Sequence, residues 1–249
     1  MPDTKIVSLV AAYDERENIE ALARRLAETL GSLQGFAHEL LFVVDGTDGT
    51  REILEGLGSA IPTIQILHRA TPRGLGNALR RGLGAVTEDT DFIVTMDADL
   101  NHQPEEIPRL LGVLQERQAD ILIGSRFIPG ARVDGTPIWK LFLSGTLNII
   151  MRIAFDLKVN DKTSGFRIYR TGALRSIEWV NENFAALPEI LIRARRAGLR
   201  VEEAPIHFIY RRAGTSKMRF WTTVFSYLTL LLMGLQSRRG RFDQKRARR

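Results

Sequence analysis

Residues 92–99 read Phe92-Ile93-Val94-Thr95-Met96-Asp97-Ala98-Asp99, an apolar run that ends in two aspartates. A short, continuous apolar run is typical of a parallel strand that is buried on both faces. Similar runs predict further strands at 6–11, 40–44, 64–67 and 121–124, and helical periodicity predicts helices at 18–30, 51–57 and 77–86. Strands that alternate with helices predict an α/β domain built on a mostly parallel sheet.

Polar residues follow four of the predicted strands. They are Tyr13-Asp14-Glu15, Asp45 to Asp48, Asp97 to Asn101 and Ser125-Arg126. In open parallel sheets, ligands bind beyond the carboxyl ends of the strands. Because folding alone does not require charged groups at four strand ends, we expect them to form one site at that edge.

The two carboxylates of Asp97-Ala98-Asp99 are candidate metal ligands. In an extended segment, residues two apart point the same way, so both carboxylates are expected on one side. They repel each other unless a cation lies between them, and a hard divalent ion whose open positions a diphosphate fills is the natural partner. The alternative is a pair of loop carboxylates that cap the next turn. The Asn101-His102-Gln103-Pro104 segment that follows favours the metal site.

A glycine-punctuated turn, Arg73-Gly74-Leu75-Gly76, precedes the predicted helix at 77–86. Backbone N–H groups at a helix N-terminus, together with Arg73, are suited to holding phosphate. The spacing matches neither a dinucleotide-binding fingerprint nor a P-loop. A plain turn is an equally good interpretation of these residues alone.

The composition is that of a globular protein, with 249 residues, 44% hydrophobic, 26% charged and a net charge of +6. The absence of cysteine excludes disulfides and thiolate metal sites, and it is compatible with a reducing compartment. No secretory signal is expected, because Met1 leads quickly into a strand-like run. Basic residues gather in 238–249, where an anionic membrane is favoured as partner over plain solvent, and nucleic acid is the least favoured.

Two apolar segments indicate contact with a membrane surface. A helix expected at about 138–155 carries a polar stripe on an apolar cylinder, formed by Lys140, Ser144, Asn148 and Arg152. It is either a core helix with a solvated edge or an interfacial helix whose stripe faces the active site. The segment 220–237 has no charge, but its polar residues follow a helical period, so an interfacial helix is favoured over a membrane span.

These motifs belong to a longer ordered series. It comprises residues 12–19 (Ala12-Tyr13-Asp14-Glu15-Arg16-Glu17-Asn18-Ile19), 73–78, 96–102, Gly124-Ser125-Arg126-Phe127, Thr163-Ser164-Gly165-Phe166-Arg167, Pro205-Ile206-His207-Phe208, Arg211 and Gly214-Thr215-Ser216-Lys217. The series resembles family 2 of the glycosyltransferases, above all its polyprenyl-phosphate branch, typified by dolichyl-phosphate mannose synthase. It departs from the family at Ala11, where proline is usual, at Asp14, where asparagine is usual, and in a shorter loop at 44–50.

The resemblance implies a GT-A fold, a nucleoside-diphosphate sugar donor and Mg²⁺ or Mn²⁺. The nucleotide-sugar contacts that it implies are Ala12, Tyr13, Glu15, Asp45, Asp48, Arg73, Asp97, Ala98, Asp99, Asn101 and Lys217. The implied metal ligands are Asp97, Asp99 and Asn101. The implied contacts to the acceptor phosphate are Arg126, Lys140, Ser144 and Arg211. The expected catalytic residues are Asp99, Arg126 and Arg211.

A phosphate acceptor is already ionised near neutral pH, so it needs positioning by cations rather than a general base. We therefore expect an inverting transferase that moves a hexose, with GDP-mannose favoured as donor, to a polyprenyl (dolichyl) phosphate. The expected organisation is a catalytic domain at 1–217, an interfacial helix at 218–237 and a basic tail at 238–249, bound peripherally at the cytoplasmic face of a membrane. The alternatives are a UDP-sugar donor, a saccharide acceptor, or a catalytically inactive lipid-surface protein of the same fold.

Overall fold

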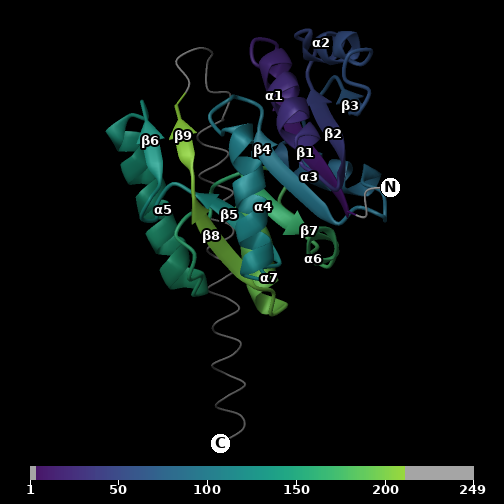
Figure 1. The fold of residues 1–249 in the computed structure, drawn as a ribbon. Helices are drawn as coiled ribbons and strands as arrows, with labels where there is room; N and C mark the ends of the chain where they lie inside the picture. The colour runs from purple at the N-terminus through teal and green to yellow at the C-terminus, as the bar shows by residue number, and fades with distance from the viewer. Residues whose placement is uncertain (1–3, 211–249) are drawn as a thin grey trace, which may run out of the picture.

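The computed structural model describes residues 4–210, which are built around a seven-stranded sheet (Figure 1). Its strands are β1 (Thr4–Tyr13), β2 (Phe36–Asp45), β3 (Ile64–Arg69), β4 (Phe92–Asp97), β5 (Ile121–Ser125), β7 (Arg167–Arg170) and β8 (Val201–Pro205). They lie in the order β3-β2-β1-β4-β7-β5-β8. All neighbours pair in parallel except β7, which runs antiparallel to β4 and β5. The predicted α/β fold with a mostly parallel sheet is thus confirmed.

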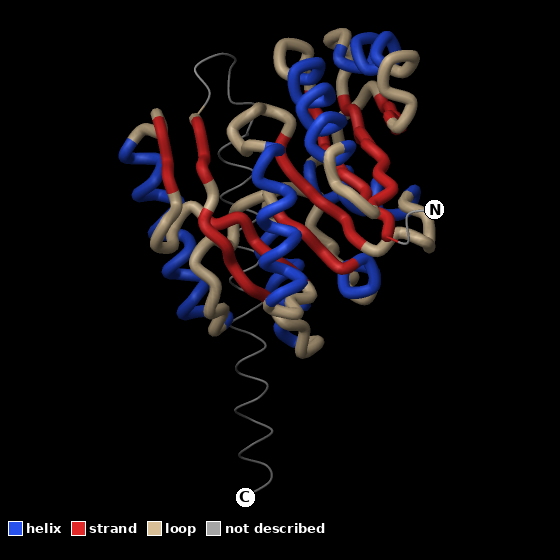
Figure 2. Tube along the Cα trace, in the orientation of Figure 1, coloured by secondary structure: helices blue, strands red, loops and turns tan. Residues whose placement is uncertain are grey.

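Helices cover both faces of this sheet (Figure 2). One core contains side chains of α1 (Ile19–Gly31), α2 (Thr50–Leu57) and α4 (Ile107–Glu116), the last preceded by the short helix η1 (Pro104–Glu106). The other core contains side chains of α3 (Leu75–Ala85), α6 (Thr171–Arg175) and α7 (Ala186–Arg196). Because both faces of the inner strands are covered, these strands are apolar along nearly their whole length.

The register of the strands brings their polar ends together. Tyr13 lies opposite Asp45 on β2, and Ala11 lies opposite Asp97 on β4. Since β7 is antiparallel to both of its neighbours, β5 runs in the same direction as β4 and ends at the same edge with Ser125. The first residue of β7, Arg167, starts from this edge. The predicted gathering of polar strand ends is therefore confirmed.

A smaller unit lies beside the last strands. It consists of a parallel pair, β6 (Arg132–Asp134) and β9 (His207–Ile209), and of α5 (Ile138–Phe155) at the flank of the molecule (Figure 1). The predicted helix at about 138–155 is confirmed. Within residues 4–210, no helix combines the length and the apolar character that crossing a membrane requires.

The structure also contains elements that the sequence did not predict, namely β6, β7, β8, β9, α4, α6 and α7. The helix predicted at 77–86 begins earlier, at Leu75, directly after Gly74, whose φ is 86°. The glycine-punctuated turn is thus the entrance to α3. The predicted helix at 218–237 and the basic tail at 238–249 lie outside the described residues.

Candidate active site

The two aspartates of the acidic motif lie on different elements. Asp97 is the last residue of β4, and Asp99 lies in the turn that follows. The expectation of one extended segment was wrong, because the chain turns at Ala98 and Leu100 takes a left-handed φ of 61°. Asn101 fixes this turn, since its backbone N–H donates to Oδ1 of Asp99 (3.2 Å) and its side-chain amide donates to Oδ2 (2.6 Å). Asn101 therefore orients the Asp99 carboxylate.

Asp97 packs against the backbone of Gly165. A β-carbon at position 165 would lie 2.7 Å from Oδ1 of Asp97, so only glycine permits this approach. The hydroxyl of Thr95 holds the segment in place by donating to the Gly165 carbonyl (2.8 Å). Burial raises the pKa of the Asp97 carboxyl to about 6, an effect that Arg126 opposes and Glu15 reinforces. A cation nearby would favour the ionised form of this carboxyl.

The donor atoms at this turn suit a metal that is shared with a substrate. Among the side chains of residues 4–210, no group of three or more His, Cys, Asp or Glu gathers as a metal cage. Asp97 and Asp99 provide carboxylate oxygens, and Asn101 provides an amide. Mg²⁺ is commonly held by one or two carboxylates together with phosphate oxygens of a substrate. The residues present fit such an ion; their role as ligands stays a prediction.

His102 is a buried residue that packs next to the acidic turn. It is buried between the rings of Phe166 and Phe208, with centroids 5.3 Å away in each case. Its Nδ1 lies 3.7 Å from Oδ2 of Asp97, and neither ring nitrogen has a hydrogen-bond partner among the described residues. Burial lowers the pKa of His102 to about 4. The ring is therefore neutral near pH 7 and packs as an aromatic side chain.

Asp45, predicted to contact the nucleoside, is held by an arginine from the next strand. Arg69 donates to both carboxylate oxygens of Asp45, from Nε (2.6 Å) and from Nη2 (2.7 Å). The backbone N–H of Arg73 donates to Oδ2 at 3.3 Å. An open cavity of about 660 Å³ adjoins this pair, lined by Arg69, Ala70, Thr71, Arg73, Asn77, Arg80 and Arg81. Its arginine-rich wall suits a phosphate-bearing ligand.

Asp48 joins the loops that follow β1 and β2. Its Oδ1 accepts from the backbone N–H (3.0 Å) and hydroxyl (2.6 Å) of Thr50, and its Oδ2 accepts from the N–H of Arg16 (3.0 Å). The N–H of Glu15 donates to the same Thr50 hydroxyl (2.9 Å). The first loop is thus fixed to the second, which places Tyr13 and Glu15 at the sheet edge; their predicted nucleotide contacts, and that of buried Ala12, stay predictions.

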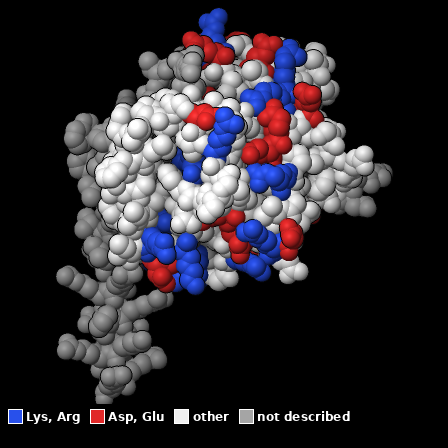
Figure 3. All heavy atoms as spheres, turned by 60° about the vertical axis from the view of Figure 1, so that its left-hand side comes forward, with Lys and Arg blue, Asp and Glu red and all other residues white. Residues whose placement is uncertain are grey.

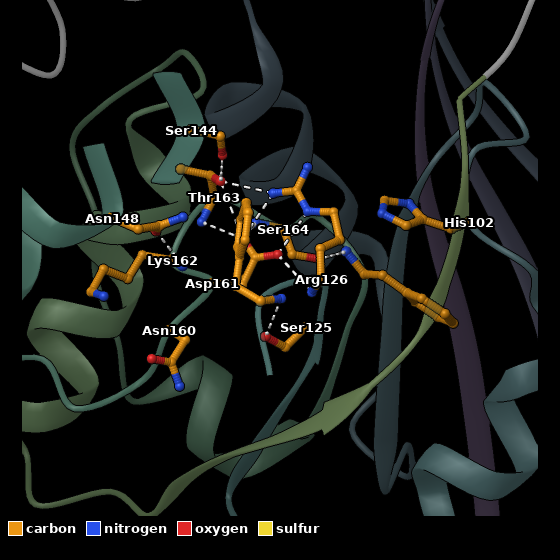
Figure 4. A network of polar contacts seen from close by, with 12 residues as sticks. His102, Ser125, Arg126, Ser144, Asn148, Asn160, Asp161, Lys162, Thr163 and Ser164 are labelled. Carbon is orange, nitrogen blue, oxygen red and sulfur yellow. Dashed lines mark hydrogen bonds and ion pairs between the residues drawn. The ribbon is translucent and has the colours of Figure 1, made fainter. Parts of the chain in front are cut away.

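The predicted acceptor residues Arg126 and Ser144 meet through one threonine (Figure 4). Arg126 follows β5 directly, and its Nη2 donates to Oγ1 of Thr163 (2.9 Å). Ser144 of α5 lies 3.3 Å from the same Oγ1. The sequence did not predict roles for Thr163 or for Asp161, which forms an ion pair with Arg126 at 2.7 Å. Arg211, Lys217 and the side chain of Lys140 lie outside what the structure describes.

The fold and the site together define the class of protein. The chain has a GT-A-like fold, in which a mostly parallel sheet carries an acidic turn and basic groups at the carboxyl ends of its strands. The family model for glycosyl transferase family 2 matches residues 9–178. The chain belongs to this family and is a glycosyltransferase.

Curated relatives cover most of the chain. The undecaprenyl-phosphate mannosyltransferase of Micrococcus luteus is 32% identical over 86% of this chain and 87% of the relative. The dolichol-phosphate mannosyltransferase of Pyrococcus furiosus is 34% identical over 90% of this chain, which corresponds to 62% of that longer protein. The polyprenol monophosphomannose synthase of Mycolicibacterium smegmatis is 33% identical over 87% of this chain and 82% of the relative.

Among solved structures, glucosyl-3-phosphoglycerate synthase from Mycobacterium tuberculosis, in complex with Mn²⁺ and UDP-glucose, is similar in fold. Its TM-score is 0.69, with 20% sequence identity, and the match covers 95% of this chain and 79% of that chain. At this level of identity the likeness concerns the fold alone.

Proposed function

We propose that this protein transfers mannose from a nucleoside-diphosphate sugar, with GDP-mannose favoured, to a polyprenyl phosphate at a membrane surface. The three relatives described above, which are mannosyltransferases or mannose synthases of polyprenol-type lipids by name, support both the sugar and the lipid. The structural observation that carries the proposal is the link from Ser144 on α5 through Thr163 to Arg126. It joins an exposed apolar helix to a cation at the sheet edge, which suits an acceptor with an apolar tail and an ionised head group.

The outer side of α5 is apolar and exposed. Phe142 is 75% exposed and Ile149 59% exposed, and their spacing places them on one side of the helix with Ile138. Figure 3, which brings this flank forward, shows a broad surface of uncharged side chains, with acidic and basic residues gathered beyond it. Ser144 and Asn148 lie on the inner side, where they contact Thr163 and Lys162. This arrangement supports peripheral binding of α5 to a membrane surface. The basic residues at 238–249 favour an anionic surface, which we propose to be that of the cytoplasmic face.

The reaction needs one in-line displacement. A lone pair on an acceptor phosphate oxygen attacks the anomeric carbon, the bond from that carbon to the diphosphate oxygen breaks, and the diphosphate leaves with the electron pair, so the configuration inverts. No proton has to be removed from an ionised phosphate, and Arg126 would position it. Mg²⁺ or Mn²⁺ held by Asp97 and Asp99 would act as a Lewis acid on the departing diphosphate.

A matrix of donors and acceptors tests the proposal. The donors are GDP-mannose, UDP-glucose and UDP-N-acetylglucosamine, and each is offered with a short polyprenyl phosphate or with a water-soluble saccharide. We expect transfer from GDP-mannose to the lipid phosphate. Efficient transfer to the saccharide, with none to the lipid, would contradict the acceptor assignment. Transfer from a UDP-sugar, with none from GDP-mannose, would show that the proposed donor is wrong.

The metal is tested by Asp99→Asn. The amide keeps the size of the side chain but lacks the charge that a divalent ion requires, so the fold should persist while turnover falls by more than about tenfold. Turnover is measured across a Mn²⁺ titration, and circular dichroism checks the fold. Near-wild-type turnover at saturating Mn²⁺ would show that Asp99 is not a metal ligand.

A further inference from the structure

Asp161 is buried completely, and hydrogen-bond donors surround its carboxylate. Its Oδ2 accepts from the backbone N–H (3.1 Å) and Nε (2.7 Å) of Arg126, and its Oδ1 accepts from Nη2 of Arg126 (2.8 Å). Oδ1 also accepts from the N–H (3.3 Å) and hydroxyl (3.2 Å) of Thr163 and from the N–H of Ser164 (3.0 Å). The carboxylate is therefore held in one place by Arg126 and by donors of its own loop.

Arg126 and Asp161 form a bidentate ion pair, called the fork below, whose two prongs are the hydrogen bonds from Nε and Nη2 (Figure 4). A planar guanidinium that gives two parallel hydrogen bonds to one carboxylate cannot rotate without breaking both. The rings of Phe127 and Phe208 lie 5.3 and 5.2 Å from the guanidinium carbon and further limit its movement. The plane and position of the Arg126 guanidinium are thus set mainly by Asp161.

The loop that carries Asp161, residues 160–166, is itself fixed from two sides. From β8, Glu203 accepts from the backbone N–H groups of Asn160 (2.7 Å) and Asp161 (2.8 Å). From α5, Asn148 accepts from the N–H of Lys162 (2.8 Å). Further along the same loop, Gly165 packs against Asp97. One rigid loop thus contacts the cation on the acceptor side and the carboxylate on the donor side.

Stability alone does not account for this pair. Removing two charges from water costs several kcal/mol for each ion, and apolar residues of similar volume are often as stable as a buried ion pair. Preorganisation of a binding group by its supporting residues is the established benefit of such an arrangement. The Arg126–Asp161 pair lies at the sheet edge where the other site residues gather, as that benefit requires.

We propose that Asp161 is a positioning residue for the acceptor: through its fork it fixes the Arg126 guanidinium in the orientation that receives the acceptor phosphate. The inference rests on the proposed function, because it takes Arg126 as the group that binds this phosphate. It assigns to Asp161 a role in acceptor affinity that is separate from binding of the nucleotide.

The variant Asp161→Asn tests the fork. Every group around the carboxylate is a donor, so the amide NH₂ of asparagine faces other donors and at least one prong is lost. We expect the KM for a short polyprenyl phosphate to rise about tenfold, the equivalent of one charge-assisted hydrogen bond. The Kd for GDP should stay within about twofold, because the predicted nucleoside contacts Tyr13 and Asp45 lie at the ends of other strands, β1 and β2. Equal losses of both affinities would overturn the inference.

A double-mutant cycle distinguishes a role of Asp161 in positioning Arg126 from a general disturbance of the structure. If Asp161 acts through Arg126, then Asp161→Asn should not raise the acceptor KM further in the Arg126→Ala background. It should also increase the thermal stability of Arg126→Ala, because that variant leaves a buried carboxylate without its partner. Additive effects on KM would show that Asp161 does not act through Arg126. If Arg126→Ala itself left the acceptor KM unchanged, the proposed function would fail at that residue instead.

Two further variants keep the test decisive if Asp161→Asn does not fold. Thr163→Val removes the hydroxyl that contacts both Arg126 and Asp161 while keeping the side-chain shape, and we expect a rise of about threefold in acceptor KM. An unchanged acceptor KM in this variant would overturn the proposal. Asn160→Ala is the matched control: it removes a contact to Glu203 (3.0 Å) next to Asp161 without touching Arg126, and its acceptor KM should stay at the wild-type value.

Discussion

At the scale of single residues, the tight packing of Gly165 against Asp97 leads to a testable prediction. A methyl group at position 165 would meet Oδ1 of Asp97 at 2.7 Å, so Gly165→Ala must displace the carboxylate or the loop. We expect turnover to fall by more than about tenfold and the Mn²⁺ concentration for half-maximal activity to rise, since a metal site tolerates little displacement of its ligands. The measurement is a metal titration of the transfer rate.

The control for this prediction is Gly172→Ala. A β-carbon at position 172, in α6, would have no atom within 4 Å, so the same substitution is tested in open space. It should leave turnover and metal dependence unchanged. A Gly165→Ala enzyme with the wild-type metal response would show that the close packing against Asp97 has no role in the site.

Lys162 leads to a prediction about how the stability of the protein depends on pH. Burial lowers its pKa to about 8, from 10.5 in the unfolded chain, although Glu203 partly opposes the shift. Between these values the unfolded chain binds more protons than the folded one, so this residue makes the protein more stable as the pH rises. The contribution is about 1.4 kcal/mol per pH unit over that window.

Chemical denaturation at pH 7.5 and pH 10 checks the Lys162 prediction against Lys162→Met. The variant removes the titrating group, so the difference in unfolding free energy, wild type minus variant, should become more positive at the higher pH. Groups other than Lys162 titrate equally in both proteins and cancel in this difference. A difference that is independent of pH would mean that the Lys162 ammonium is not destabilised by burial.

At the scale of elements, the proposed function requires α5 to lie between the apolar tail and the ionised head group of the acceptor. Replacing Phe142 and Ile149 together by serine should weaken binding to vesicles that contain polyprenyl phosphate by about tenfold or more, because burial of apolar area in the bilayer interface is lost. The fold should be little affected, because both side chains are mostly exposed. Vesicle co-sedimentation and thermal unfolding provide the two measurements.

Val180 offers a matched control for α5. It is 61% exposed and lies in the segment between α6 and α7, where it lines a cavity with residues of α3 and α6 and none of α5. Val180→Ser should leave vesicle binding unchanged. If the α5 double variant bound vesicles as well as the wild type, α5 would not be the membrane-facing element.

The strands that sequence patterns found, β1 to β5, are those with mostly apolar runs. β7 escaped prediction because it reads Arg167-Ile168-Tyr169-Arg170, with an arginine at each end. Yet Arg167 is fully buried, and its guanidinium donates to the carbonyls of Ser164, Lys162 and Leu187. Carbonyl groups of the preceding loop and of Leu187 in α7 compensate this buried charge, and a search for apolar runs does not reveal such a strand. β8 lies at the edge of the sheet and carries two glutamates, so it also lacks an apolar run and was not predicted.

The residues of the candidate site also fall into those that the sequence could predict and those that it could not. The positions of Asp97, Asp45 and Arg126 at the sheet edge were predictable because each ends or directly follows a strand, and Asp99 comes two residues after the end of β4. Asp161 and Gly165 were not assigned roles, because their partners Arg126 and Asp97 lie far away in sequence and meet them only through the position of β7. The turn at Ala98 was also missed, since an Asp-x-Asp pattern does not distinguish an extended segment from a turn that Asn101 fixes.

At the scale of the whole molecule, charge and apolar surface should contribute separately to membrane binding. Seven basic residues lie in 238–249, and each contributes on the order of 1 kcal/mol near an anionic surface, a contribution that salt screens. Deleting residues 238–249 should therefore weaken binding to anionic vesicles at low salt and have little effect at high salt. Binding isotherms at two ionic strengths measure this. Equal losses at both would contradict an electrostatic role for the tail.

The position of β7 also determines the order in which the molecule can be completed during synthesis. β3, β2, β1 and β4 are adjacent in space and come from residues 4–97, so they can pair as soon as they leave the ribosome. β5 has no partner in that group, because β7 lies between it and β4. A nascent chain that ends before Arg167 therefore exposes open edges on both β4 and β5, which invite pairing with other chains. With the proposed site assignments, the strands that carry the nucleotide contacts can therefore pair early, whereas the acceptor contacts depend on the last third of the described chain.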